Sequence, residues 1–329
     1  MEKMKAVIYE KFGPPEVLMI RERDKPVPGD NEVLVKVRAT TVNAADCNVR
    51  GFSYIPPGLG FLARMMMGFG KPKISIPGSA LAGDVEAVGK DVKLFKPGDA
   101  VYGTGPEMGA YAEYACRPEE GALALKPKEL SYEEAAALPY GALTALYFLK
   151  DKANVGTGQK VLVVGASGGV GVFAVQIAKY FGAGVTGVCS SANADLVRSL
   201  GADHVIDYTK EDLTGYGEKW DIIIDIVVGK TSFSRYRKVI NPYGYYLAVA
   251  GGLGDMLQMV RTSLSGSKKV IFGGGTACEK KENMLILNKM VEEGKLKPVI
   301  DKNFSLEQIV EAHRYAESGR KRGSVAVTV

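Results

Sequence analysis

The segment Val161-Leu-Val-Val-Gly-Ala-Ser-Gly-Gly-Val-Gly171 decides the fold, because an apolar run ends there in a glycine-rich turn and leads into a helical pattern at 172–181. Residues 161–164 are typical of a strand buried on both faces. The glycines permit backbone conformations and close approaches that a Cβ would forbid. Backbone amides of such a turn, together with the positive end of the following helix, form a site for a pyrophosphate.

The order of strand, turn and helix predicts a dinucleotide-binding site, with a plain strand-to-helix turn as the alternative. The spacing departs from strict G-x-G-x-x-G because Ala166 occupies the position of the first glycine. The predicted cofactor-binding residues of the turn are Gly165, Ala166, Ser167, Gly168, Gly169, Val170 and Gly171.

Composition indicates an ordinary globular protein of 329 residues, 46% hydrophobic and 24% charged, a length typical of about two domains. The four cysteines form no C-x-x-C pair, so neither a disulfide framework nor a zinc ribbon is indicated. We expect a cytoplasmic protein, because no apolar stretch is long enough to span a membrane and no signal-peptide pattern opens the chain. The net charge of +5 is dispersed, which favours a solvated surface over a nucleic-acid interface.

The first part of the chain, to about residue 125, has short apolar segments separated by glycine and proline turns, which predicts an irregular β domain. The expected strands are 6–9, 32–41, 81–88, 100–103 and 111–115. The pattern changes after Pro127, where Ser131 and Glu134 have the spacing of a helix capping box. We expect Pro139 to interrupt the helix that they open.

Strands and helices alternate in the following part, which predicts right-handed βαβ crossovers and a doubly wound parallel sheet, the Rossmann arrangement. The expected strands are 161–164, 185–189, 222–228, 245–250 and 270–272. A helix follows near 281–293, and the tail holds an amphipathic helix at 306–316 and a closing strand at 324–329. We expect this tail to rejoin the first domain, because a terminal strand needs a sheet partner. The predicted fold is therefore α/β, with domains 1–125 plus 297–329 and 126–296.

The end of the second Rossmann strand indicates which nicotinamide cofactor binds. An NAD site has an acidic residue there, about 20 residues after the turn, but this chain has Ser190, Ser191 and Asn193. Hydroxyl and amide groups can donate to a 2′-phosphate that a carboxylate would repel, so NADP is favoured over NAD. No arginine follows the strand directly, although Arg198 and Lys210 are candidates, and the two serines are equally suited to capping the next helix.

Several segments together resemble the medium-chain dehydrogenase/reductase superfamily, in its zinc-independent branch of quinone oxidoreductases and zeta-crystallin-like reductases. They span nearly the whole chain in the order of the family, at 41–46, 77–89, 95–103, 165–171 and 201–208. The resemblance implies a GroES-like β-rich catalytic domain, a Rossmann domain that binds NADP(H), and an active site in the cleft between them. It also implies a homodimer formed through the edge strand 270–272.

Zinc-dependent members of the superfamily hold a metal with a cysteine, a Gly-His-Glu motif and a later cysteine or aspartate. Here Asn43 lies near the first ligand position, and Gly78-Ser79-Ala80 replaces Gly-His-Glu. His204 and His313 lie outside this region and lack ligand spacing, so we expect them to be structural or surface residues. No metal site is predicted.

Without a metal, hydride transfer is favoured where the resulting negative charge spreads over a conjugated system that hydrogen-bond donors can stabilise. We therefore predict NADPH-dependent reduction of a quinone or an α,β-unsaturated carbonyl. The alternative is a weakly catalytic, zeta-crystallin-like protein that binds or senses NADPH and could bind single-stranded RNA. Dispersed basic residues make nucleic acid the less favoured partner.

The resemblance also assigns the catalytic residues, which are Asn43, Asp46 and Tyr54. Asn43 would hydrogen-bond a substrate oxygen or a cofactor ribose, and Tyr54 would donate to the developing oxyanion. The alternative for Asn43 and Asp46 is that they fix the turn after the strand. The alternative for Tyr54 is ordinary packing.

Further cofactor-binding residues follow from the same resemblance. Thr144 would lie near the nicotinamide, Tyr208 would help hold the adenosine phosphate, and Gly251 and Gly252 would let the nicotinamide approach the chain. The segment 52–76 is rich in phenylalanine and methionine, which favours a roof over an apolar substrate pocket or, alternatively, an insertion packed on the β domain.

Overall fold

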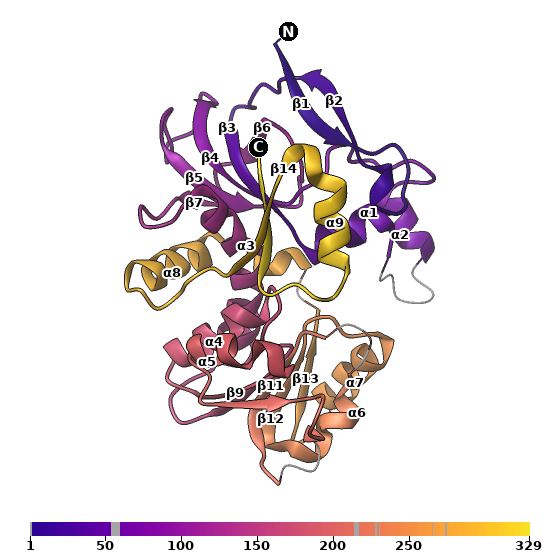
Figure 1. Ribbon diagram of the computed structural model, residues 1–329, viewed down its shortest axis with the longest axis vertical. Coiled ribbons are helices and arrows are strands. Elements are labelled where there is room, and N and C mark those ends of the chain that lie inside the picture. Colours follow the sequence, from indigo (N-terminus) through magenta and orange to yellow (C-terminus); the bar gives the residue numbers. More distant parts are fainter. Residues whose placement is uncertain are drawn as a thin grey trace. The chain divides into compact units, whose positions relative to one another are not determined.

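The computed structural model describes residues 2–53, 60–213, 217–227, 229, 231–264, 266–273 and 275–329, without the side chains of Leu62, Met66 and Thr276. The chain divides into two compact units (Figure 1). The first unit comprises Met1–Tyr140, Glu279–Glu292 and Pro298–Val329, and the second comprises Gly141–Cys278 and Glu293–Lys297.

The first unit is built around a seven-stranded sheet. Six of its strands follow the order β14-β15-β3-β4-β5-β7, and the seventh, β6, pairs with β3. Its elements are β1 (Lys3–Ile8), β2 (Met19–Asp24), β3 (Glu32–Val42), α1 (Ala44–Gly51), α2 (Gly60–Met67), β4 (Ala80–Val88), β5 (Ala100–Thr104), β6 (Tyr114–Pro118), β7 (Ala122–Leu125), the first part of α3 (Tyr132–Leu146), α8 (Lys281–Glu292), β14 (Ile300–Ser305), α9 (Ile309–Glu317) and β15 (Ser324–Thr328). Strand β1 pairs with β2 in a separate two-stranded sheet, and its Ala6 forms an isolated antiparallel bridge with Ala112.

The C-terminal tail completes this sheet. Strand β15 pairs antiparallel with β3, with Val325 opposite Val42, and parallel with β14. Apolar side chains of β15 and α9 pack in one cluster with residues from the start of the chain, among them Val7 and Tyr9. The prediction that the tail rejoins the first domain is confirmed.

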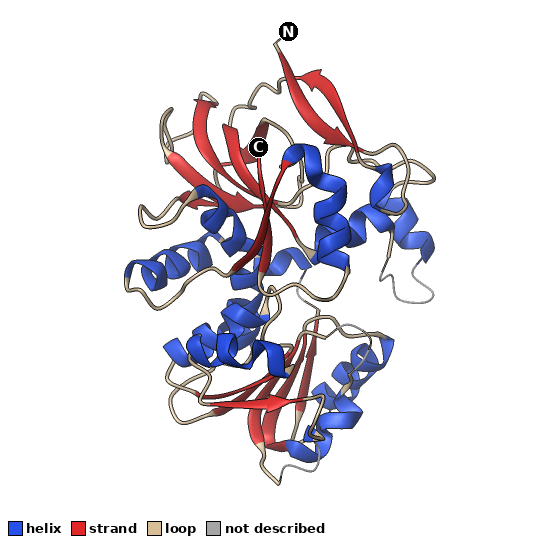
Figure 2. Ribbon diagram, in the orientation of Figure 1, coloured by secondary structure: helices blue, strands red, loops and turns tan. Residues whose placement is uncertain are grey.

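The second unit is a six-stranded parallel sheet in the order β10-β9-β8-β11-β12-β13. Its elements are β8 (Lys160–Val164), α4 (Gly171–Tyr180), β9 (Gly184–Cys189), α5 (Ala194–Ser199), β10 (His204–Asp207), β11 (Trp220–Asp225), α6 (Phe233–Tyr236), β12 (Ile240–Ala248), α7 (Leu253–Leu264) and β13 (Lys269–Phe272). Helices α4 and α5 lie on one face of the sheet and α6 and α7 on the other (Figures 1 and 2). The doubly wound parallel sheet is thus confirmed. The strand order reverses between β8 and β11, where such sheets bind their ligands.

The helix α3 differs from its prediction. The capping box is confirmed, since Glu134 N donates to Ser131 Oγ at 3.1 Å and Ser131 N donates to Glu134 Oε2 at 2.8 Å. The interruption at Pro139 is wrong, because α3 continues to Leu146 and then passes into a π-helical turn at Tyr147–Lys152. Burial of its apolar residues on both sides of Pro139 offsets the hydrogen bond that proline cannot donate.

The predicted strand 111–115 is also displaced, because β6 begins at Tyr114. The amides of Ala110 and Tyr111 donate instead to the carbonyls of Gly78 and Pro77, at 2.9 and 3.0 Å. The helix α8, assigned from the sequence to the second domain, belongs to the first unit. Its Asn288 accepts from Tyr102 Oη at 2.8 Å and donates to the Leu125 carbonyl at 3.1 Å, which ties it to β5 and β7.

Candidate functional site

Asn43 is the residue from which the part of the site in the first unit is built. It follows β3 and is the N-cap of α1, where its Oδ1 accepts from the amides of Ala45 (2.9 Å) and Asp46 (3.2 Å). Its Nδ2 donates to Ser79 Oγ at 2.8 Å. An amide nitrogen carries two N–H groups, and the second has no acceptor among the residues that the structure describes. Within the described part of the chain, one N–H of Asn43 thus has no protein acceptor.

Asp46 is 0% exposed, and its carboxylate holds Asn43 and Ser79 together. Oδ2 accepts from Asn43 N and Oδ1 accepts from Ser79 N, both at 3.0 Å. Burial raises the pKa of Asp46 to about 6, although these hydrogen bonds oppose the rise. Since both oxygens already accept backbone amides, the geometry supports a positioning role for this predicted site residue.

Ser79 is a site residue that the sequence reasoning did not select, although it lies in the segment that replaces Gly-His-Glu. It is buried just before β4, and its hydroxyl, amide and carbonyl contact Asn43, Asp46 and Arg117 respectively. The only sequence signal was its place in that motif. Tyr54, the third predicted catalytic residue, lies outside the described residues.

The glycine turn at the end of β8 fits the phosphates of a dinucleotide. Gly165 has φ +84°, a left-handed conformation that favours glycine, and a Cβ on Gly171 would lie 2.1 Å from the Gly165 carbonyl oxygen. The amides of Gly169, Val170 and Gly171, at the N-terminus of α4, donate to no acceptor within the described part of the chain. Free amides at the positive end of a ten-residue helix form an anion site.

Asn193 links this turn to the predicted adenosine end, because its Nδ2 donates to Ser167 Oγ at 3.0 Å. Ser190 follows β9 and caps no helix with its side chain, so the capping alternative fails for this serine. The structure thus brings Ser167, Ser190 and Asn193 to the carboxyl ends of β8 and β9. These residues lie where the sequence predicts the adenosine ribose.

Asp207 is a charged neighbour that the sequence reasoning missed. It ends β10 opposite Cys189 of β9, accepts from Ser191 Oγ, and accepts from Thr209 Oγ1 at 2.7 Å. The hydrogen bonds from Ser191 and Thr209 lower its pKa to about 2, so it is ionised. The ammonium of Lys210 lies 3.7 Å from its carboxylate. The Ser191 hydroxyl therefore donates to Asp207. Of the three residues predicted at the adenosine end, Ser190 and Asn193 remain as donors to a ligand.

The other predicted cofactor residues all lie in the second unit. Thr144 is half-buried in α3, and Tyr208 is exposed after β10. Gly251 follows β12 in tight packing, because a Cβ there would lie 2.8 Å from Asp255 Oδ2 and 2.9 Å from the Ala248 Cβ. A Cβ on Gly252 would meet open space.

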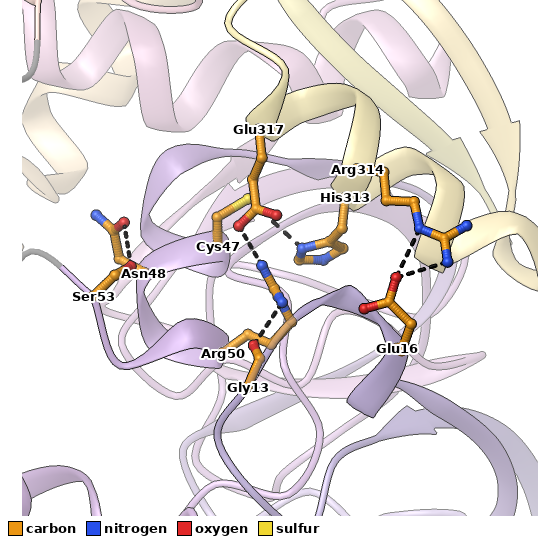
Figure 3. A network of polar contacts seen from close by, with 9 residues as sticks. All are labelled: Gly13, Glu16, Cys47, Asn48, Arg50, Ser53, His313, Arg314 and Glu317. Carbon is orange, nitrogen blue, oxygen red and sulfur yellow. Dashed lines mark hydrogen bonds and ion pairs between the residues drawn. The ribbon is translucent and has the colours of Figure 1, made fainter.

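A separate polar network in the first unit connects residues of α1 and α9 (Figure 3). His313 of α9 is fully buried, with its Nδ1 3.6 Å from Cys47 Sγ of α1 and its ring edge-on to Tyr111. Arg50 of α1 donates to the Gly13 carbonyl at 2.7 Å and pairs with Glu317 of α9. Burial lowers the pKa of His313 to about 3 and raises that of Cys47 to about 12, so both are neutral. The prediction of a structural role for His313 agrees with these contacts, which join α9 to α1.

Comparisons with known proteins cover the whole chain. Residues 29–128 match a family model described as an alcohol dehydrogenase GroES-like domain, and residues 200–327 match one described as a zinc-binding dehydrogenase. The chain is 36% identical to 2-methylene-furan-3-one reductase of Solanum lycopersicum, over 99% of this chain and 79% of that protein. It is 34% identical to quinone-oxidoreductase QR1, chloroplastic, of Triphysaria versicolor, over 98% of each chain. The chain belongs to the medium-chain dehydrogenase/reductase superfamily.

Solved structures agree with this membership. The structure of the quinone oxidoreductase from Coxiella burnetii superimposes with a TM-score of 0.86 at 30% identity, and the match covers 100% of each chain. The predicted family, its quinone oxidoreductase branch and the combination of a GroES-like and a Rossmann domain are therefore confirmed.

One of the two matching family models is described as a zinc-binding dehydrogenase, so we looked for side chains that could bind a metal ion. Within the described ranges, no group of three or more His, Cys, Asp or Glu side chains is placed to hold a metal ion. Metal independence stays a prediction. In that same part of the chain, no helix is long and apolar enough to cross a membrane.

Proposed function

We propose that this protein is an NADPH-dependent oxidoreductase that transfers hydride, without a metal ion, to a quinone or an α,β-unsaturated carbonyl. The observation that carries the proposal is the glycine turn, where free amides at the start of α4 fit a pyrophosphate. The names of two relatives support the substrate class, because a 2-methylene-3-one is an α,β-unsaturated ketone and the other relative is a quinone oxidoreductase.

A bound reduced nicotinamide would supply the hydride, and the residues of the chain would bind and orient the reactants. The free N–H of Asn43 would donate to the substrate oxygen that becomes negative as hydride arrives. Asp46 and Ser79 would hold the Asn43 amide in that orientation, which is the preorganisation that stabilises developing charge. Water would deliver the proton that completes the reduction.

The preference for NADPH over NADH is part of the proposal. Ser190 and Asn193 would donate to the 2′-phosphate, and Lys210 would contribute a positive charge. Asp207 opposes this preference because its carboxylate is ionised. Calorimetry tests whether the donors and Lys210 outweigh Asp207. It compares the binding of NADPH and of NADH to the wild-type protein and to Lys210→Ala. Tighter binding of NADH by the wild-type protein would refute the preference.

Steady-state turnover tests the function itself. We expect the purified chain to oxidise NADPH in the presence of 9,10-phenanthrenequinone and in the presence of an alkenal, at rates that a zinc chelator leaves unchanged. Oxidation of saturated alcohols with NADP+ is the control reaction. Turnover of saturated alcohols alone, with a required metal, would overturn the proposal.

Three further features belong to the proposal. They are a cytoplasmic location, a homodimer through β13, the edge strand of the six-stranded sheet, and an apolar roof over the substrate at 52–76. In the described part of this segment, Phe61, Met65 and Phe69 are exposed, as an apolar substrate contact requires. Elution volume tests the dimer, and Met65→Glu should raise KM for long-chain more than for short-chain alkenals.

A further inference from the structure

Arg117 of β6 is a buried guanidinium that no carboxylate pairs. It is 2% exposed, and it forms no ion pair among the described residues. Its Nη1 donates to the Cys116 carbonyl at 2.9 Å and its Nη2 donates to the Ser79 carbonyl at 3.3 Å, but Nε has no partner. Burying a charge that lacks an ion-pair partner is unfavourable, so a purely structural role would be better served by an apolar residue.

Two more buried polar atoms in this neighbourhood lack partners, Thr104 Oγ1 and Glu279 Oε2. Thr104 precedes Gly105, whose amide donates to the same Ser79 carbonyl as Arg117, at 3.3 Å. Burial and the charge of Glu107 raise the pKa of Glu279 to about 7, while Arg117 opposes the rise. The charges of Glu107, Glu279 and Glu32 act on Arg117 from a distance and raise its pKa, but burial outweighs them and lowers it.

The link from Arg117 to the candidate site is short. The guanidinium binds the carbonyl of Ser79, and the hydroxyl of Ser79 accepts from the Nδ2 of Asn43. Both contacts are made by one residue, so a single side chain and its own backbone carbonyl connect the charge of Arg117 to the amide of Asn43. In a low-dielectric interior, a buried charge acts on a nearby substrate more strongly than the same charge would in water.

We propose that Arg117 is an electrostatic positioning residue of the substrate site, which holds Ser79 and Asn43 in place and favours negative charge on the substrate oxygen. The inference rests on the proposed function for its account of where that charge arises. As hydride adds two electrons to the conjugated system, the oxygen becomes an enolate or a phenolate, and water later supplies the proton. The positive charge of Arg117 performs part of the task that a metal ion performs in zinc-dependent dehydrogenases.

Two variants and a control test this role. Arg117→Met removes the charge and fits a buried site, Arg117→Lys keeps the charge, and Arg38→Met removes an exposed charge that pairs with Asp84 on the surface of the same unit. The first readout needs no cofactor and no turnover. It is the apparent pKa of bound 4-nitrophenol, whose phenolate absorbs in the visible and resembles the product oxygen.

The wild-type protein and Arg38→Met should bind the phenolate form more tightly than the neutral phenol. Arg117→Met should raise the apparent pKa of the bound phenol by about one unit, which corresponds to about a tenfold loss of preference. Arg117→Lys should restore most of it. Equal binding of the two forms by the wild-type protein, no binding of either form, or the same apparent pKa in Arg117→Met, would overturn the proposal.

Kinetics provide the second readout. Arg117→Met should lower kcat for an alkenal about tenfold and change KM by less than about twofold, because the charge acts mainly in the transition state. If Arg117 were merely structural, Arg117→Met would lower the unfolding temperature and leave kcat per folded molecule unchanged. That result would contradict the inference. If the wild-type protein reduces no alkenal or quinone, the proposed function fails, while the phenol titration still decides the role of Arg117.

Discussion

The substitution Gly171→Ala tests the geometry of the phosphate turn. A Cβ at this position would lie 2.1 Å from the Gly165 carbonyl oxygen and 2.8 Å from the Cα of Ala166, where ordinary contacts begin at 3.4 Å. The turn must therefore open by about 1.3 Å at its narrowest point. Overpacking of this kind costs about 1–3 kcal/mol, which corresponds to a roughly 5- to 150-fold increase in Kd if the strain falls on the binding conformation.

The assay is calorimetric titration of NADPH, with thermal unfolding of the cofactor-free protein beside it. Gly168→Ala is the matched control, because a Cβ there meets the same carbonyl oxygen at 3.4 Å, an ordinary contact, and should leave the unfolding temperature unchanged. Gly171→Ala should weaken NADPH binding at least fivefold and lower the unfolding temperature. Wild-type affinity in Gly171→Ala, or equal loss of stability in the two variants, would refute the reasoning.

The remaining predictions concern titration, positioning and cofactor choice. Burial lowers the pKa of His313 to about 3 while the unfolded chain protonates near 6.5, so stability should fall as the pH drops from about 6.5 toward 3, and His313→Phe should flatten this dependence in acid unfolding curves. The folded-state pKa of Asp46 is raised to about 6, so its contribution has the opposite sign: it is fully present below about 4 and is lost as the pH rises through about 6. Asp46→Asn should remove that dependence and, because an amide cannot accept both backbone N–H bonds, should lower the free energy of unfolding by about 1–3 kcal/mol in denaturant titrations. Glu317→Gln should destabilise the protein, since Arg50 is buried and loses its charged partner, and an unchanged denaturation midpoint would contradict this. Asp207→Asn should increase the ratio of NADPH to NADH affinity, and a ratio equal to that of the wild-type protein would argue against a 2′-phosphate site at this end.

The architecture follows from local patterns in the sequence. Continuous apolar runs predict the strands of the parallel sheet, and the spacing of Ser131 and Glu134 predicts the start of α3. Strand β2 escapes prediction because its sequence, MIRERD, is mostly charged and only its pairing with β1 fixes it. Strand β14 is likewise extended because β15 lies beside it.

The candidate site is only partly visible in the sequence. The turn at 165–171 is local, so its residues are predicted together. Ser79 and Asn43 are 36 positions apart, and they meet because β3 and β4 pair. Asp207 reaches Ser191 through the register of β9 and β10. The unpaired charge of Arg117 is a property of burial, which depends on the packing of the whole unit and which no local pattern indicates.

Transfer of label from the cofactor tests the central claim most directly. NADPH that carries deuterium at both C4 positions of the dihydronicotinamide is incubated with the protein and an α,β-unsaturated ketone, and the product is examined by NMR. The account predicts a saturated ketone with one deuterium at its β-carbon for each NADPH consumed. A protein that binds NADPH but yields no product, or a product that carries no deuterium at that carbon, would contradict it.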